Sequence, residues 1–104
     1  MTMVPDNSES IEEPTMHEMI KSRRMGRFSI GRSLLEQDPA LAMLVLSKVA
    51  VSRCECFFDS NTFEYWGWSE DFAPVPLGQK APWYDVYVNV LGPDGPRTIE
   101  FRAR

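Results

Sequence analysis

The chain has 104 residues, which is room for one small domain, because a domain typically holds about 100–200 residues. Hydrophobic residues make up 43% of the chain and charged residues 25%, an ordinary globular composition that excludes a wholly disordered or collagen-like protein. No apolar run approaches the roughly 20 residues of a membrane-spanning helix, and two cysteines are too few for a disulfide framework. We therefore expect a cytoplasmic protein.

The net charge of −4 is unevenly distributed along the chain. Residues 1–18 hold five acids and no base, whereas residues 19–32 hold five bases and no acid. Residues 33–96 hold nine acids against three bases, a net charge of −6. Such an acidic body disfavours direct binding of nucleic acid and favours a partner with a basic surface.

The composition of the first segment of the chain predicts that it has no fixed structure. Residues 1–14 combine prolines, serines and acids with few large apolar groups, so we expect a disordered acidic tail followed by a single domain over 15–104. Thr15 and Glu18 match a capping box, in which a hydroxyl and a carboxylate satisfy the first backbone N–H groups of a helix. This predicts a first helix from Thr15 to about Arg24.

Two more helices are predicted before the chain turns to strands. The apolar stripe of Ile30 and Leu34 predicts a helix over about 29–36. Asp38 followed by Pro39 is typical of an N-cap and a first helical residue, so a third helix covers about 39–48. This third helix is apolar on nearly all sides, which indicates that it lies in the core.

From Val49 onward, apolar residues alternate with polar ones as in strands. Strands are expected over about 49–58, 63–68, 83–91 and 97–102, with a long Pro- and Gly-rich loop over 69–82 and a hairpin turn at Gly92 to Pro96. Helices first and strands afterwards predict an α+β fold, with N-terminal helices followed by a four-stranded antiparallel β-meander.

Signatures of catalysis are missing from the sequence. There is no phosphate-binding glycine loop and no nucleophile elbow, and His17 has no nucleophile near it in sequence. Cys54 and Cys56 are interpreted as small buried side chains facing the core helix, because a zinc site needs about four ligands, although a dimer would pool two such pairs. We expect a protein that is not an enzyme, with no metal and no cofactor.

The basic segment over 21–32 supports two interpretations. Its arginines can form a solvated face paired with the acidic tail, or they can bind phosphate. In the second case Arg23, Arg24, Arg27 and Arg53 hold the phosphates of a nucleotide, and the ring of Phe28 stacks on its base.

Aromatic residues are concentrated between residues 57 and 87. Alternation places Trp66 and Trp68 on the same face as Glu64 and opposite Phe63 and Tyr65, so both faces of this strand are aromatic. Either both faces are wrapped in core or one of them is a binding surface, since tryptophan and tyrosine are common anchors of interfaces. A partner-binding surface would comprise Glu64, Trp66, Trp68, Glu70, Asp71 and Trp83.

The last 45 residues or so carry a spaced motif. It reads Phe58-x4-Phe63-Glu64-Tyr65-x3-Ser69-x2-Phe72-x2-Val75-x2-Gly78-x3-Pro82-x-Tyr84-x-Val86. This segment resembles small accessory proteins of bacteriophages. The resemblance implies an anti-defence protein similar to anti-CRISPR inhibitors, acting in the cytoplasm of an infected host, and carries over no catalytic residue.

Two functions are therefore expected. The first is a non-enzymatic acidic protein that binds a basic groove of a host nucleic-acid-handling defence protein, such as a CRISPR nuclease complex, without contacting nucleic acid or membrane. The alternative is an oligomeric module, such as a homodimer, that sequesters a nucleotide signalling ligand.

Overall fold

A computed structural model of the chain describes residues 16–104. The elements in chain order are α1 (Met16–Lys21), β1 (Met25–Gly31), α2 (Arg32–Gln37), α3 (Pro39–Leu46), β2 (Ala50–Phe57), β3 (Thr62–Trp68), β4 (Tyr84–Val90) and β5 (Arg97–Ala103). The predicted tail over 1–14 and the Thr15 capping residue lie outside the described residues.

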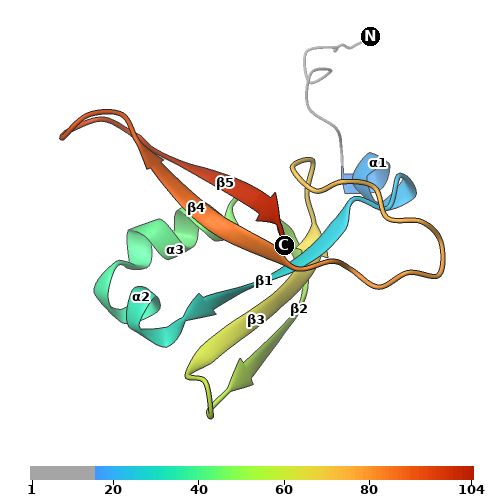
Figure 1. Cartoon of the computed structure of the whole chain (residues 1–104), viewed down its shortest axis with the longest axis horizontal. Coiled ribbons are helices and arrows are strands. Elements are labelled where there is room, and N and C mark those ends of the chain that lie inside the picture. The colour runs from blue at the N-terminus through green and yellow to red at the C-terminus, as the bar shows by residue number, and fades with distance from the viewer. Residues whose placement is uncertain (1–15) are drawn as a thin grey trace, which may run out of the picture.

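The strands form two antiparallel sheets, one of three strands in the order β1-β3-β2 and one of two strands, β4 and β5. The two-stranded hairpin begins beside β1, where the N–H of Arg27 donates to the carbonyl of Pro82 at 2.9 Å. From there the hairpin leads away from the three-stranded sheet and passes α3 (Figure 1). The fold is thus mostly β, and the predicted helices followed by a four-stranded meander are wrong.

The main error of the sequence prediction concerns residues 25–31, which form a strand, whereas the prediction left 25–28 between two helices and placed 29–31 at the start of the second helix. Gly26, Phe28 and Ile30 are buried while the residues between them are half-buried, which is a period of two. The pattern is hard to recognise because its first inward residue is a glycine. A Cβ at Gly26 would lie 2.7 Å from the Tyr84 ring, so only glycine allows that ring to pack against the strand.

The order of the strands is the second difference. β3 lies between β1 and β2, and both of its edges are therefore already paired. The chain leaves β3 through the loop over 69–83 and then forms the hairpin as a separate sheet. This loop is held by the basic segment: the Arg24 guanidinium donates to the Phe72 carbonyl at 3.0 Å, and Arg23 Nε donates to the Val75 carbonyl at 2.9 Å. Ser69, which is fully buried, donates its hydroxyl to the Lys48 carbonyl at 2.8 Å.

Other predictions are confirmed. The third helix begins at Pro39 after Asp38, whose carboxylate accepts from the Leu41 N–H at 3.2 Å, and the four predicted strands are present. The predicted turn joins β4 and β5 in an antiparallel pair. No helix within residues 16–104 is long and apolar enough to cross a membrane.

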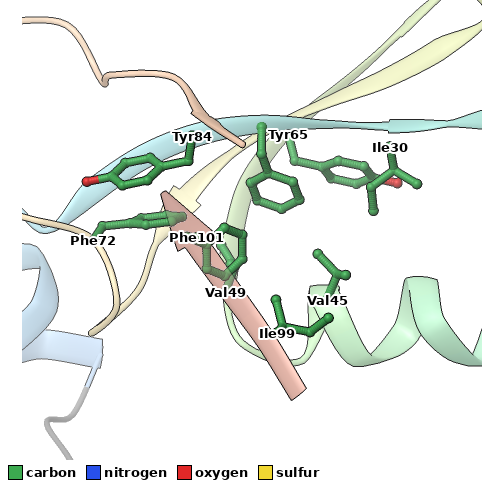
Figure 2. Close-up of a cluster of buried hydrophobic side chains, with 9 residues drawn as sticks. Ile30, Val45, Val49, Tyr65, Phe72, Tyr84, Ile99 and Phe101 are labelled. Atoms are coloured by element: carbon green, nitrogen blue, oxygen red, sulfur yellow. The ribbon is translucent and has the colours of Figure 1, made fainter. Parts of the chain in front are cut away.

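The core lies where the hairpin meets the three-stranded sheet, and aromatic rings fill it (Figure 2). The Phe101 ring centroid lies 5.4 Å from Phe28, 5.0 Å from Phe72 and 6.4 Å from Tyr84. Phe28 in turn stacks on Tyr65 at 5.4 Å. Rings from the sheet, the loop and the hairpin therefore pack directly against one another.

We expect Phe101→Ala to lower the free energy of unfolding by about 3–5 kcal/mol, because it removes the ring that joins the two sheets and leaves a cavity. Urea denaturation followed by circular dichroism measures this. Leu77→Ala is the control, since Leu77 is 85% exposed and its truncation should change stability by less than about 0.5 kcal/mol. Equal stabilities of the two variants would contradict this account of the core.

The Asp38 carboxylate makes part of the stability depend on pH. The Arg97 guanidinium, 2.7 Å away, lowers the pKa of this carboxyl below its ordinary value of 3.8, and the hydrogen bond from Leu41 adds to the shift. A lowered pKa in the folded state stabilises the fold above the unfolded value, and this contribution is lost as the pH falls through the folded value.

Asp38→Asn should therefore melt at a lower temperature than the unsubstituted chain at neutral pH, and the gap should close in acid below pH 3.8. The asparagine keeps an oxygen for the helix N-cap, so the comparison isolates the charge. Thermal denaturation of both proteins across this range measures the gap. A gap of constant size would show that the ion pair with Arg97 does not contribute.

Candidate functional site

The outer face of the three-stranded sheet, on the side away from the core, carries a row of arginine and tryptophan residues. The strand register places Arg27 of β1 and Arg53 of β2 on either side of Trp66 of β3. Trp83 pairs with Arg27 on its other side through an isolated bridge, and Trp68 lies two residues beyond Trp66. The three tryptophans are half-buried, so each keeps part of its ring accessible.

Guanidinium groups pack on the indole rings of this row. The Arg53 guanidinium lies 4.5 Å from the Trp66 ring centroid, and those of Arg27 and Arg104 lie 4.6 and 4.8 Å from Trp83. Such cation–π contacts contribute about 0.5–1 kcal/mol each at exposed positions and hold the rings in place. The Nε of Arg27 is buried without a hydrogen-bond partner among the described residues, a cost that the contact with Trp83 partly offsets.

Carboxylates surround the row. Glu55 pairs with Arg53, and Asp85 accepts from Arg104 at 2.8 Å. Glu64 lies beside Trp66 on the outer face, and Glu70 and Asp71 follow Trp68 in an exposed turn. None of these three acids takes part in an ion pair within residues 16–104. On the face itself Glu55, Glu64 and Asp85 balance the three guanidinium groups, and Glu70 and Asp71, which follow Trp68 in the chain, add two further acids.

A cavity of about 190 Å³ opens in the same face. Its lining comprises Met25, Gly26, Ser52, Arg53, Trp66, Gly67, Trp68 and Ala81. The indole rings of Trp66 and Trp68 and the side chains of Met25 and Ala81 make it largely apolar, and among the described residues that line it Arg53 alone carries a charge. It can take an apolar or flat aromatic group that carries a negative charge next to Arg53.

The structure brings together residues that the sequence had assigned to different sites. We predicted Trp66, Trp68, Trp83, Glu64, Glu70 and Asp71 for a protein partner and Arg27 and Arg53 for a nucleotide. The tryptophans, Glu64 and the two arginines lie on the outer face, and Glu70 and Asp71 lie in the exposed turn that follows Trp68. The alternation of Trp66 and Trp68 against Tyr65 is confirmed, since Tyr65 is only 9% exposed and packs in the core.

The predicted nucleotide cluster is not a single site. Phe28 is 0% exposed, in the centre of the core, so its ring is not accessible to a base. Arg23 and Arg24 hold carbonyls of the loop over 69–83, so both act in the fold. The reason is that the basic segment is a strand with an inner and an outer side, and of its arginines only Arg27 joins the row of tryptophans.

Arg104, which contacts Trp83 and Asp85, was not among the residues predicted for the site. In the β4–β5 register Tyr84 faces Ala103, and the Arg104 N–H donates to the Trp83 carbonyl at 3.1 Å. The turn at Gly92 to Pro96 already implied this register. Extending the predicted hairpin by one residue would have placed Arg104 opposite Trp83.

The cysteines are not buried, contrary to our interpretation. Cys54 and Cys56 are both exposed free thiols, because β2 is an edge strand and its inner side extends past the core. Burial is the main cause that raises the pKa of Tyr65 above its ordinary value, and the neighbouring Cys54 thiol raises it further. His17 is exposed, and the described part of the chain holds no group of three or more potential metal ligands.

Comparison of the chain with protein-family models, with curated proteins and with solved structures gives no match.

Proposed function

We propose that this chain is a non-catalytic binding protein that docks the outer face of its three-stranded sheet on another protein. The observation that carries the proposal is the convergence of Trp66, Trp68 and Trp83, from two separate chain segments, on one half-exposed face with a cavity. Tryptophan and arginine are the residue types most enriched among interface hot spots. The cation–π contacts reduce the entropy that these side chains lose on binding.

The proposed partner is a host protein with a basic surface, of the nucleic-acid-handling defence class that includes CRISPR nuclease complexes. Its support is electrostatic. Glu64 on the outer face, and Glu70 and Asp71 in the turn after Trp68, form no ion pair with another residue of 16–104 and belong to a segment of net charge −6. A basic nucleic-acid channel complements such a surface, and the opposite charges would accelerate association.

Trp66→Ala and Trp68→Ala should each weaken partner binding by at least ~2 kcal/mol, about 30-fold, without unfolding the chain. The reason is that each removes an anchor that lies outside the core. Titration calorimetry with the purified partner measures the affinity. Leu77→Ala is the matched control, because it truncates an exposed apolar residue away from this face. Unchanged affinity in both tryptophan variants would exclude the outer face as the interface.

The partner is found by affinity capture from a bacterial lysate, using the unsubstituted chain, Trp66→Ala and Leu77→Ala in parallel at low and high salt. The expected result is a nucleic-acid enzyme retained by the unsubstituted chain and by Leu77→Ala, lost with Trp66→Ala and weakened by salt. The purified enzyme should then be inhibited by the chain. Absence of any protein whose capture depends on Trp66 overturns the proposal.

The cavity favours a second candidate function, sequestration of a nucleotide. Trp66 and Trp68 offer ring surface for a base, and Arg53, at the edge of the same cavity, offers a guanidinium for phosphate. The candidate nucleotide site therefore comprises Trp66, Trp68 and Arg53, and no longer the predicted cluster around Phe28. The Arg53 side chain is 60% exposed, so it can exchange its contact with Glu55 for a ligand.

A bound nucleotide should raise the melting temperature, since a ligand present at a hundred times its dissociation constant adds about 2.7 kcal/mol to stability. Differential scanning fluorimetry with a panel of cyclic nucleotides measures this shift. Arg53→Ala should abolish it, whereas Arg102→Ala, which removes an exposed arginine of the hairpin, should retain it. A panel without any shift would exclude this second function.

A further inference from the structure

β2 has one edge that pairs with β3 and one edge that pairs with no strand among the described residues. β2 is an outer strand of the three-stranded sheet, and the backbone of residues 51–57 makes no hydrogen bond to described residues outside β3. Its outer edge therefore presents a row of unpaired N–H and C=O groups, which another strand can satisfy. Most of its side chains are exposed, including Val51 at 44% and Phe57 at 37%.

The order of side chains along β2 is self-complementary about Cys54. In an antiparallel pair of two such strands centred on this residue, Arg53 of one copy faces Glu55 of the other, and Glu55 faces Arg53. Both residues lie on the outer face, as their pairing with Trp66 and Glu64 shows, so the opposed charges meet on one side of the sheet. Oppositely charged cross-strand pairs are stabilising, and this register contains two by symmetry.

Neighbouring registers fit less well. Moving the partner strand by two residues places Glu55 directly opposite Glu55 of the other copy, and like charges in that position are destabilising. Moving it by one residue turns the inner side of one copy towards the outer side of the other. The bulge between Val51 and Arg53 ends the regular part of the strand, which keeps the pairing short and centred near Cys54.

The exposed cysteines on the inner side of β2 are the second observation that favours pairing with another copy of this strand. Cys54 and Cys56 point to the same side as Tyr65 and Phe63, towards the core, yet both thiols are exposed. A second copy related by a two-fold axis would set its own thiols beside them and continue the inner side of the sheet. This removes small, weakly polar side chains from water on both copies.

From these observations we infer that the chain forms a symmetric homodimer in which the two β2 strands pair antiparallel about Cys54 and form one six-stranded sheet. The two outer faces then lie on the same side of that sheet. Each dimer presents two copies of the tryptophan row, and a partner with two sites would bind both. The inference does not rest on the proposed function, because its evidence is the edge of β2 and not the tryptophans.

Charge reversal tests the pairing. The unsubstituted chain is expected to be a dimer by sedimentation equilibrium. Arg53→Glu or Glu55→Arg should weaken the dimer by about tenfold or more, since each turns both cross-strand pairs into like-charge pairs. The double variant R53E/E55R should restore it, because the swapped charges again face opposite partners. A monomeric unsubstituted chain, or a double variant no better than either single one, overturns the inference.

Cross-linking tests the register. Antiparallel neighbours have Cα atoms about 4.5 or 5.5 Å apart, within the range that a disulfide spans. Diamide takes two electrons and two protons from two Cys54 thiols, which become one intermolecular disulfide. A covalent dimer is expected from the unsubstituted chain and from Cys56→Ser, and not from Cys54→Ser. Cross-linking through Cys56 alone would show a different register and contradict the proposal. Both tests are independent of any partner, so they can fail or succeed without the proposed function.

Discussion

The contact on which the rest of the structure depends is the packing of Phe101 against rings from the three-stranded sheet and the loop. The hairpin meets that sheet through few backbone hydrogen bonds, so side chains hold the two together. Phe28, Phe72, Tyr84 and Phe101 supply this contact, with ring centroids 4.6 to 6.4 Å apart. Aromatic pairs at such separations bury much apolar area and favour particular relative orientations, which fixes how the hairpin is placed.

This core uses the inner side of the sheet, and the outer side is consequently left for other purposes. Trp66 and Trp68 alternate with Tyr65, so they point away from the core as a direct result of its burial. The start of the hairpin brings Trp83 beside Arg27, and the end of the hairpin brings Arg104 to the same indole ring. One placement of the hairpin therefore stabilises the core and completes the proposed binding face.

The two edges of the three-stranded sheet differ in a way that bears on assembly. β1 is covered in part by the loop and the start of the hairpin, through Pro74 and Trp83. No described residue covers the outer edge of β2 in this way, and Cys54 and Cys56 on its inner side are exposed. An edge strand with unpaired backbone groups tends to associate, and proteins limit this with charges and bulges. In β2 both devices are present, and in the proposed dimer their arrangement about Cys54 selects another copy of β2 as the partner strand.

The sequence by itself determined the local features. The Asp38–Pro39 helix start, the four later strands, the hairpin turn and the opposite orientation of Trp66 and Tyr65 follow from short-range rules, because caps, turns and alternation involve neighbours in the chain. Tertiary structure alone decided that the segment Met25–Gly31 is a strand, that β3 lies in the middle of its sheet, and that Arg27 and Arg53 join the tryptophans. The reason is that strand order, and the burial of Phe28, depend on contacts between residues far apart in sequence, which no local pattern encodes.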